Sequence, residues 1–243
     1  MRYSSPRPFT MSTLLFDTIK AAARLTDRVA VSYSGGKDSA VVLDLCVRFF
    51  KHVEVFYMYI VPGLSFQEAM WKWVEQRYGL DVWMVPHFAL SNFLRWGLYR
   101  IPDYSVPIIT PADVYAHMRA VTGCYWIAGG ETLRDSLMRR GMINNFGTVS
   151  LKRGRIFPLA HWKKSEIFDY IKRYRLKISP ESSVLGYSFG ELDPFSLYQI
   201  KRHYPNDYEI IRAWFPFADV AVLHYELFAQ AGQRKGDIRV QAA

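Results

Sequence analysis

A short polar segment, Ser34-Gly35-Gly36-Lys37-Asp38-Ser39, separates two apolar stretches early in the chain. The preceding residues 29–33 are typical of a buried strand, and the following residues continue as an apolar helix to about Phe50. A sharp turn from a strand into a helix N-terminus gathers backbone N–H groups that bind oxyanions. The segment therefore predicts a phosphate site.

The residue types in this segment suit that chemistry. We expect Gly35 and Gly36 to allow positive φ and a close approach of phosphate to the backbone. Lys37 supplies a positive charge, and Asp38, in the first helical turn, can cap the helix or hold a Mg²⁺ that bridges to the phosphates. Three hydroxyls can donate to phosphate oxygens: Ser32, Ser34 and Ser39.

Strand and helix patterns alternate along the first half of the chain. Apolar periodicity and glycine or proline breaks predict helices over 16–25, 37–50, 65–78 and 111–121, and strands over 29–33, 53–60, 81–85 and 124–128. Ser65 and Glu68 form a capping-box pattern, and Gly79 and Gly123 end their helices. The alternation predicts an α/β fold: a doubly wound, mostly parallel sheet with helices on both faces, followed by a helical C-terminal region.

The phosphate loop differs from both G-x-x-x-x-G-K-[ST] and G-x-G-x-x-G. It resembles the Ser-Gly-Gly-x-Asp-Ser "PP-loop" of the N-type ATP pyrophosphatases and the phosphoadenosine phosphosulfate (PAPS) reductases. The alternative, an ordinary glycine turn, is disfavoured by six matching positions between a strand and a helix. The resemblance implies an adenine nucleotide alpha hydrolase-like fold that binds a nucleotide outside the carboxyl ends of its strands.

A second segment, 129–140, resembles the family pattern Gly-x-Arg-x-x-(Glu/Gln)-Ser-x-x-Arg. Four residues fall on this spacing, with aspartate in place of glutamate: Gly130, Asp135, Ser136 and Arg139. Thr132 stands where the family has its first arginine, and Arg134 lies two positions further on. A guanidinium presents a planar fork to phosphate or sulfate. The alternative is a surface helix start with an Asp135–Arg139 pair at i,i+4, which contributes little to stability.

The resemblance continues through 157–171 and through Gly186-Tyr187-Ser188-Phe189-Gly190, so it spans about residues 16–190. Within the first of these segments, we expect Trp162 and Tyr170 to be packing residues. We predict a PP-loop nucleotide-binding domain over residues 1–180 and a C-terminal helical extension over 181–243.

The chain has only two cysteines, Cys46 and Cys124, and the default interpretation is two buried thiols. A [4Fe–4S] cluster needs about four thiolates, and the C-terminal cysteine that the reductases use is missing. We therefore predict no iron–sulfur cluster and no sulfonucleotide reduction by the chain's own thiols.

Nucleotide cleavage does not need those cysteines. The resemblance implies binding of ATP and Mg²⁺, cleavage to AMP and pyrophosphate, and adenylation of an acceptor. In that scheme Lys37, Arg139 and Arg134 are the catalytic cations, Asp38 is the metal ligand, and Gly130 and Ser136 help bind the nucleotide. By analogy with the fold, adenine would lie near residues 57–61.

Positive charge is concentrated in residues 134–202, which hold 14 Lys and Arg against 6 Asp and Glu, while the whole chain has a net charge of +9. Such a segment suits nucleotide phosphates or a nucleic acid. Five of these cations also fit a solvated helix face: Lys163, Lys164, Lys172, Arg173 and Arg175.

Two other functions fit the same residues. The chain could bind PAPS or its 3′-dephospho form (APS) and transfer sulfur with a thiol from a protein partner, or it could be a non-catalytic nucleotide-binding or nucleic-acid-binding subunit. No apolar run is long enough to span a membrane, and residues 1–11 lack an apolar signal core. We therefore expect a cytoplasmic protein.

Overall fold

A six-stranded sheet forms the centre of the computed structural model, which describes residues 13–228. Its strands are β1 (Arg28–Ser32), β2 (His52–Tyr59), β3 (Val82–Pro86), β4 (Ile127–Ala128), β5 (Val149–Ser150) and β6 (Arg155–Ile156). The order across the sheet is β3-β2-β1-β4-β6-β5, and every neighbouring pair is parallel except β5 and β6. Residues 232–243, whose polar composition predicts a frayed end, lie outside the described residues.

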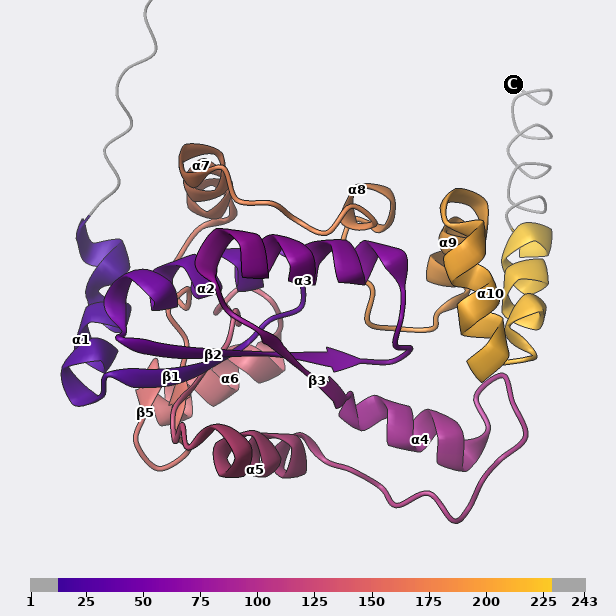
Figure 1. Cartoon of the computed structure of the whole chain (residues 1–243), viewed down its shortest axis with the longest axis horizontal. Helices are drawn as coiled ribbons and strands as arrows, with labels where there is room; N and C mark the ends of the chain where they lie inside the picture. Colours follow the sequence, from indigo (N-terminus) through magenta and orange to yellow (C-terminus); the bar gives the residue numbers. More distant parts are fainter. Residues whose placement is uncertain (1–12, 229–243) are drawn as a thin grey trace, which may run out of the picture.

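Helices cover both faces of this sheet, which confirms the predicted α/β class (Figure 1). One face packs against α1 (Asp17–Leu25), α2 (Lys37–Phe49), α3 (Ser65–Tyr78) and α7 (Lys164–Tyr174). The other face packs against α5 (Pro111–Thr122) and the start of α4 (Phe88–Trp96). The remaining elements are the 3-10 helix η1 (Thr13–Phe16), α6 (Leu137–Phe146), α8 (Ser182–Leu185), α9 (Pro194–His203), α10 (Pro205–Trp214) and a helical stretch over 218–228.

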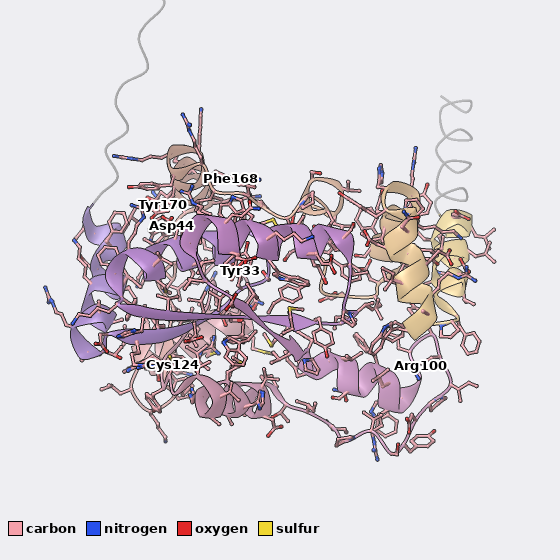
Figure 2. The ribbon with its side chains drawn as sticks, in the orientation of Figure 1. Tyr33, Asp44, Arg100, Cys124, Phe168 and Tyr170 are labelled. Atoms are coloured by element: carbon pink, nitrogen blue, oxygen red, sulfur yellow. The ribbon has the colours of Figure 1, made fainter. Side chains whose placement is uncertain are left out.

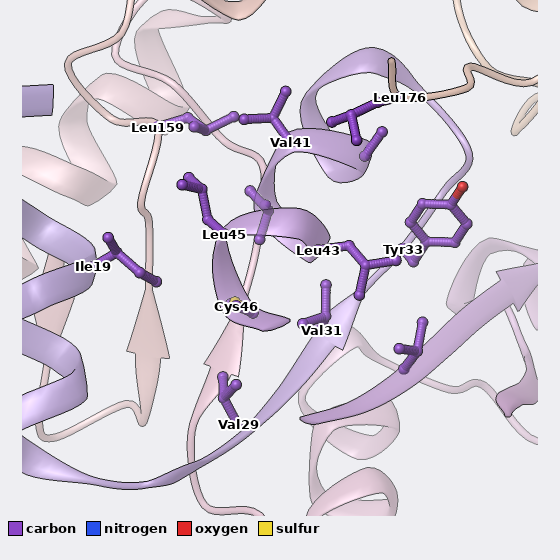
Figure 3. Packing of buried hydrophobic residues seen from close by; sticks show 14 of the residues in the cluster. Ile19, Val29, Val31, Tyr33, Val41, Leu43, Leu45, Cys46, Leu159 and Leu176 are labelled. Atoms are coloured by element: carbon purple, nitrogen blue, oxygen red, sulfur yellow. The ribbon is translucent and has the colours of Figure 1, made fainter. Parts of the chain in front are cut away.

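The central strand β1 is buried on both faces because its apolar residues point in both directions. Val29 and Val31 face α2 and belong to the larger core cluster, where they lie beside Leu43 and Cys46 (Figure 3). Ala30 points to the opposite face and belongs to the cluster under α5. A continuous apolar strand of this kind is what a parallel sheet covered on both sides requires.

A buried carboxylate joins three helices on the α2 side. Asp44 of α2 accepts hydrogen bonds from Arg48 at 2.6 Å, from the Tyr78 hydroxyl at 2.9 Å and from the Tyr170 hydroxyl at 2.7 Å. Figure 2 shows Asp44 and Tyr170 close together between α2 and α7. Tyr170 and Trp162 are buried in the main cluster, as expected for packing residues.

The helix boundaries follow the sequence signals in most places. Gly79 and Gly123 end α3 and α5 with left-handed φ values of 65° and 67°. The predicted capping box at Ser65 is wrong, because Leu64 is the N-cap residue and makes no side-chain cap hydrogen bond. Helix α4 was not predicted.

Residues of the C-terminal helices complete a second core. Leu197, Ile200 and Ile211 pack in one cluster with Val61 and Leu64, which follow β2. Asp207 of α10 is buried and accepts hydrogen bonds from the Ser65 amide at 2.6 Å and the Ser65 hydroxyl at 2.7 Å. The N-terminus of α3 is therefore capped by a residue 142 positions away in the chain.

Over residues 13–228, no helix is long and apolar enough to cross a membrane.

Replacing Asp207 by alanine should lower the free energy of unfolding by about 1–3 kcal/mol, because it removes the buried carboxylate that accepts both hydrogen bonds from Ser65. Urea denaturation measures this change. Glu209→Ala is the matched control on the same helix, since Glu209 is exposed and pairs only with Arg212 in the described range. Its effect should stay below about 1 kcal/mol. Equal effects of the two substitutions would contradict the capping role.

Candidate functional site

The loop between β1 and α2 turns through Gly35, whose φ is 74°. Gly36 has φ −75° and ψ 167°, an extended conformation open to other residues. The expectation of positive φ is therefore right for Gly35 and wrong for Gly36. Space is what restricts Gly36, because a Cβ there would lie 3.1 Å from Ser188 Oγ and 3.4 Å from Ser34 Oγ.

Two of the predicted phosphate-binding hydroxyls shape the loop itself. The Ser39 hydroxyl accepts from the Ser34 amide at 3.1 Å and donates to the Gly36 carbonyl at 3.0 Å. The hydroxyls of Ser34 and Ser39 are 3.2 Å apart. Ser39 is buried, whereas Ser34 lies at the surface and Ser32 ends β1 half-buried. Of these three residues, Ser34 is the most accessible to a ligand.

Lys37 and Asp38 open helix α2 and form an ion pair through Lys37 Nζ and Asp38 Oδ2. The other carboxylate oxygen, Asp38 Oδ1, is buried and has no hydrogen-bond partner among the described residues. Burial raises the pKa of Asp38 above its ordinary value, and the charge of Asp135 adds to this effect, while Lys37 and Arg139 oppose it. The first-turn amides of α2 have no acceptors within the helix. An anion at this turn would meet both the amides and Lys37.

The segment after β4 packs directly on the start of α2. A Cβ on Gly130 would lie 3.0 Å from Asp38 Cβ and 3.2 Å from the Ser39 amide nitrogen, so only glycine fits without displacing the loop. The Asp135 carboxylate accepts from the Thr132 amide and from the Thr132 hydroxyl, each at 2.8 Å. The two predicted segments therefore meet at one edge of the sheet.

Arg139 and Ser136 lie at the start of α6. Ser136 is the N-cap residue, and its hydroxyl accepts from the Arg139 amide at 3.2 Å. The Arg139 guanidinium pairs with Asp135 at 3.2 Å and remains more than half exposed. The Arg134 guanidinium instead donates to the Trp162 carbonyl at 3.1 Å. Both arginines are exposed, and of the two only Arg139 is paired with a carboxylate of the 129–140 segment.

A third segment, 179–190, reaches the same loop and was only partly foreseen. The Ser179 amide donates to the Gly35 carbonyl at 2.8 Å, and the Ser188 hydroxyl donates to Ser34 Oγ at 3.4 Å. The motif at 186–190 was visible in the sequence, but its contact with the loop was not. No local pattern marks Ser179, because its partner is distant in the chain.

Most side chains of the region predicted to lie near adenine, residues 57–61, are packed inside the protein. Tyr57 is buried and accepts a hydrogen bond from Gln67 at 2.6 Å, and Ile60 and Val61 are buried against the C-terminal helices. Tyr59 is half-buried. Packing therefore covers most of the side chains at this end of β2.

The basic segment 134–202 is spread over several places. Figure 1 shows α6 and α7 on opposite sides of the sheet. Arg155 is buried and pairs with Glu131 at 2.8 Å, and Lys201 pairs with Asp219 at 2.7 Å. The positive charge therefore does not lie on one face.

The two cysteines are buried on opposite faces of the sheet, Cys46 in the cluster with α2 and Cys124 in the cluster with α5. Cys124 precedes β4, so it lies toward the amino end of that strand, away from the candidate site (Figure 2). The two thiols cannot ligate a common cluster in this fold.

The residues at the loop fit a Mg²⁺ that is bound together with phosphate. Asp38 offers one buried carboxylate oxygen without a protein partner. Between residues 13 and 228, no group of three or more His, Cys, Asp or Glu is arranged to hold a metal ion by protein ligands alone. Mg²⁺ bound to nucleotides commonly uses one or two carboxylates with substrate phosphates and water, and this donor set matches that arrangement.

The geometry is that of a doubly wound α/β protein in which the 34–39 loop and the 129–140 segment meet at the carboxyl edge of the sheet, where folds of this class bind their ligands. Residues 28–88, which contain the loop, match the family model for the phosphoadenosine phosphosulfate reductase domain. This match confirms the family resemblance seen in the sequence. Comparison with curated proteins found no significant match.

Solved structures support the fold. A PAPS reductase from Candida auris, in a phosphate complex, is similar with a TM-score of 0.52 and 16% identity, over 73% of this chain and 87% of that one. The likeness confirms the predicted α/β fold with its mostly parallel sheet.

Two further structures are similar at lower scores. The U34-tRNA thiolase NcsA from Methanococcus maripaludis has a TM-score of 0.45 at 17% identity, over 84% of this chain and 79% of that one. An NH3-dependent NAD synthetase from Campylobacter jejuni has a TM-score of 0.43 at 16% identity, over 92% and 93%.

Asp38→Asn should stabilise the fold at neutral pH, because the raised pKa shows that the folded protein disfavours the ionised carboxylate. A carboxyl whose pKa is higher in the folded state loses stability as the pH rises from its unfolded pKa through its folded pKa. The gain from Asp38→Asn should therefore be absent near pH 4 and grow toward pH 7.5. Urea denaturation across this range measures it.

Asp81→Asn is the matched control, since Asp81 is exposed beside β3. Its stability profile should follow that of the unmodified protein. An Asp38→Asn variant that is less stable than the unmodified protein at pH 7.5 would contradict the analysis of Asp38.

Proposed function

We propose that the protein is a PP-loop enzyme that binds ATP with Mg²⁺ and cleaves it between the α- and β-phosphates, transferring AMP to an acceptor. The observation that carries this proposal is the packing of Gly130 against Asp38. This contact joins the phosphate loop to the segment that bears Arg139. A cationic side chain from each segment can then act on one bound anion.

The first turn of α2 would hold the β- and γ-phosphates. The amides after Gly36 supply hydrogen bonds and the positive end of the helix dipole. Lys37 adds a full charge by exchanging its bond to Asp38 for one to phosphate. Asp38 would hold Mg²⁺, which when bound neutralises phosphate charge. The main contribution of these residues is to fix the phosphates in place.

The chemical step needs no protein nucleophile. An acceptor oxygen or nitrogen attacks the α-phosphorus, and the bond from that phosphorus to the oxygen bridging to the β-phosphorus breaks. Pyrophosphate leaves with the bonding electrons, and the acceptor loses its proton to solvent. Arg139, which is more than half exposed at the start of α6, would stabilise the charge that develops at the reacting phosphate. Arg134 would support the segment through its bond to Trp162.

A nucleic acid is the acceptor class that we favour, because the chain carries a net charge of +9. The cations beside the site, Arg139 and Arg140, would guide a polyanion toward the loop.

Incubation with ATP labelled separately at the α- and γ-phosphates tests the reaction. The proposal predicts labelled AMP or AMP–acceptor and labelled pyrophosphate. ADP with orthophosphate would contradict it. In the same assay Arg139→Ala should lower the rate at least about tenfold with little change in ATP affinity, because a charge-assisted contact made in the transition state contributes about 1.5–3 kcal/mol.

Arg24→Ala is the matched control for Arg139→Ala, since it removes the same charge from an exposed position on α1. It should leave the rate unchanged. If Arg139→Ala is also silent in binding and turnover, the 129–140 segment has no part in the reaction.

The family match favours a second candidate function. In this alternative the protein binds PAPS and transfers sulfur with a thiol that a protein partner supplies. Both of this chain's own thiols are buried. Calorimetry with ATP and Mg²⁺ against PAPS separates the two functions. We expect tighter binding of ATP with Mg²⁺, and markedly tighter binding of PAPS would favour the second function instead.

A further inference from the structure

The C-terminal segment 179–190 touches both glycines of the phosphate loop. The Ser179 amide is bound to the Gly35 carbonyl, and a Cβ on Gly35 would lie 3.1 Å from Ser179 Cβ. At the other end of the segment, Ser188 Oγ lies 3.1 Å from where a Cβ on Gly36 would be. The segment therefore forms one wall of the anion site.

A single buried carboxylate holds both ends of this wall. Glu181 is 1% exposed and accepts hydrogen bonds from the Ser179 hydroxyl and from the Phe189 amide, the latter at 3.1 Å. The first contact is made by Ser179, whose amide also binds the Gly35 carbonyl. The second is made by Phe189, which follows Ser188 in the chain. Burial raises the pKa of Glu181, which agrees with a carboxyl enclosed by the protein.

The Ser188 hydroxyl is positioned to take part in phosphate binding. It is half-buried, so a ligand can reach it. Its bond to Ser34 Oγ is long at 3.4 Å, whereas hydroxyl–hydroxyl bonds are commonly 2.5–3.0 Å. Breaking this weak hydrogen bond so that Ser188 can donate to a phosphate oxygen would cost little free energy.

We propose that Ser188 is a further phosphate ligand, supplied from outside the PP-loop, and that Glu181 is the positioning residue that holds it there. The proposal rests on the proposed function, since it assigns Ser188 to the β- and γ-phosphates of ATP. Neither residue belongs to the loop or to the Arg139 segment. Phosphate would then be enclosed by three separate parts of the chain.

Calorimetry with three probes tests the Ser188 assignment: ATP with Mg²⁺, inorganic pyrophosphate with Mg²⁺, and AMP. Ser188→Ala should weaken binding of ATP and pyrophosphate about tenfold, because it removes a hydrogen bond to a charged group. Binding of AMP should not change. Ser183→Ala is the matched control, since Ser183 lies in the same segment and its hydroxyl donates to the Pro180 carbonyl.

Variants of Glu181 test the positioning role. Glu181→Gln keeps a side-chain oxygen for the Phe189 amide and should bind pyrophosphate nearly as the unmodified protein does. Glu181→Ala should weaken binding about tenfold, and combining it with Ser188→Ala should cause no further loss. If Glu181→Ala does not fold, Glu181→Asp, which is too short to reach both partners, takes its place in the comparison.

The outcomes distinguish the proposed function from the roles assigned to Ser188 and Glu181. Failure of the unmodified protein to bind ATP or pyrophosphate overturns the proposed function and this inference with it. Normal binding by the unmodified protein with no effect of Ser188→Ala overturns the Ser188 assignment alone. Equal weakening of pyrophosphate and AMP binding also overturns it, because AMP lacks the β- and γ-phosphates to which Ser188 is assigned. Additive losses in the double variant overturn the role of Glu181.

Discussion

The parallel pairing of β1 with strands on both of its sides is the constraint on which the site depends. β2 pairs along the whole of β1, and β4 pairs with its carboxyl half, with Ala30 opposite Ile127 and Val31 opposite Ala128. Because β1 and β4 end almost level, the segments that follow them leave the sheet together. This register brings Gly130 onto Asp38 and fixes the distance between two motifs about a hundred residues apart in the chain.

Each cation of the proposed site is paired with a carboxylate close to it in the sequence. Lys37 pairs with Asp38, and Arg139 pairs with Asp135. These ion pairs hold both cations near the 34–39 loop. An entering polyphosphate would compete for the cations and leave Asp38 free to bind a metal ion. The raised pKa of Asp38 is the cost of placing this carboxylate in a partly buried position.

The sequence was informative where one residue type satisfies a local requirement. Gly79 and Gly123 end helices because each adopts positive φ, and the polar loop at 34–39 follows a strand with an apolar, buried centre, so these features could be predicted. The order of strands and helices up to β4 followed from the same local patterns except for α4, whereas the short strands β5 and β6 were not predicted. The parallel sheet alone predicted that the 34–39 loop and the 129–140 segment lie at its carboxyl edge.

Contacts between distant segments could not be predicted. Ser65 had the spacing of a capping box, yet both its amide and its hydroxyl bind the buried carboxylate of Asp207 on α10. Gly36 was expected to need positive φ, whereas what limits it is Ser188, more than 150 positions away. Such partners leave no periodicity in the sequence.

The most direct test of the account is a crystal structure of the protein with Mg²⁺ and a non-hydrolysable ATP analogue. The account predicts the β- and γ-phosphates at the first turn of α2, within hydrogen-bond distance of the amides after Gly36. It also predicts that Lys37 will have turned from Asp38 toward these phosphates, and that the α-phosphate will lie on the side of the loop that faces Arg139. A triphosphate bound elsewhere, or one at the loop with its α-phosphate directed away from Arg139, would contradict the account.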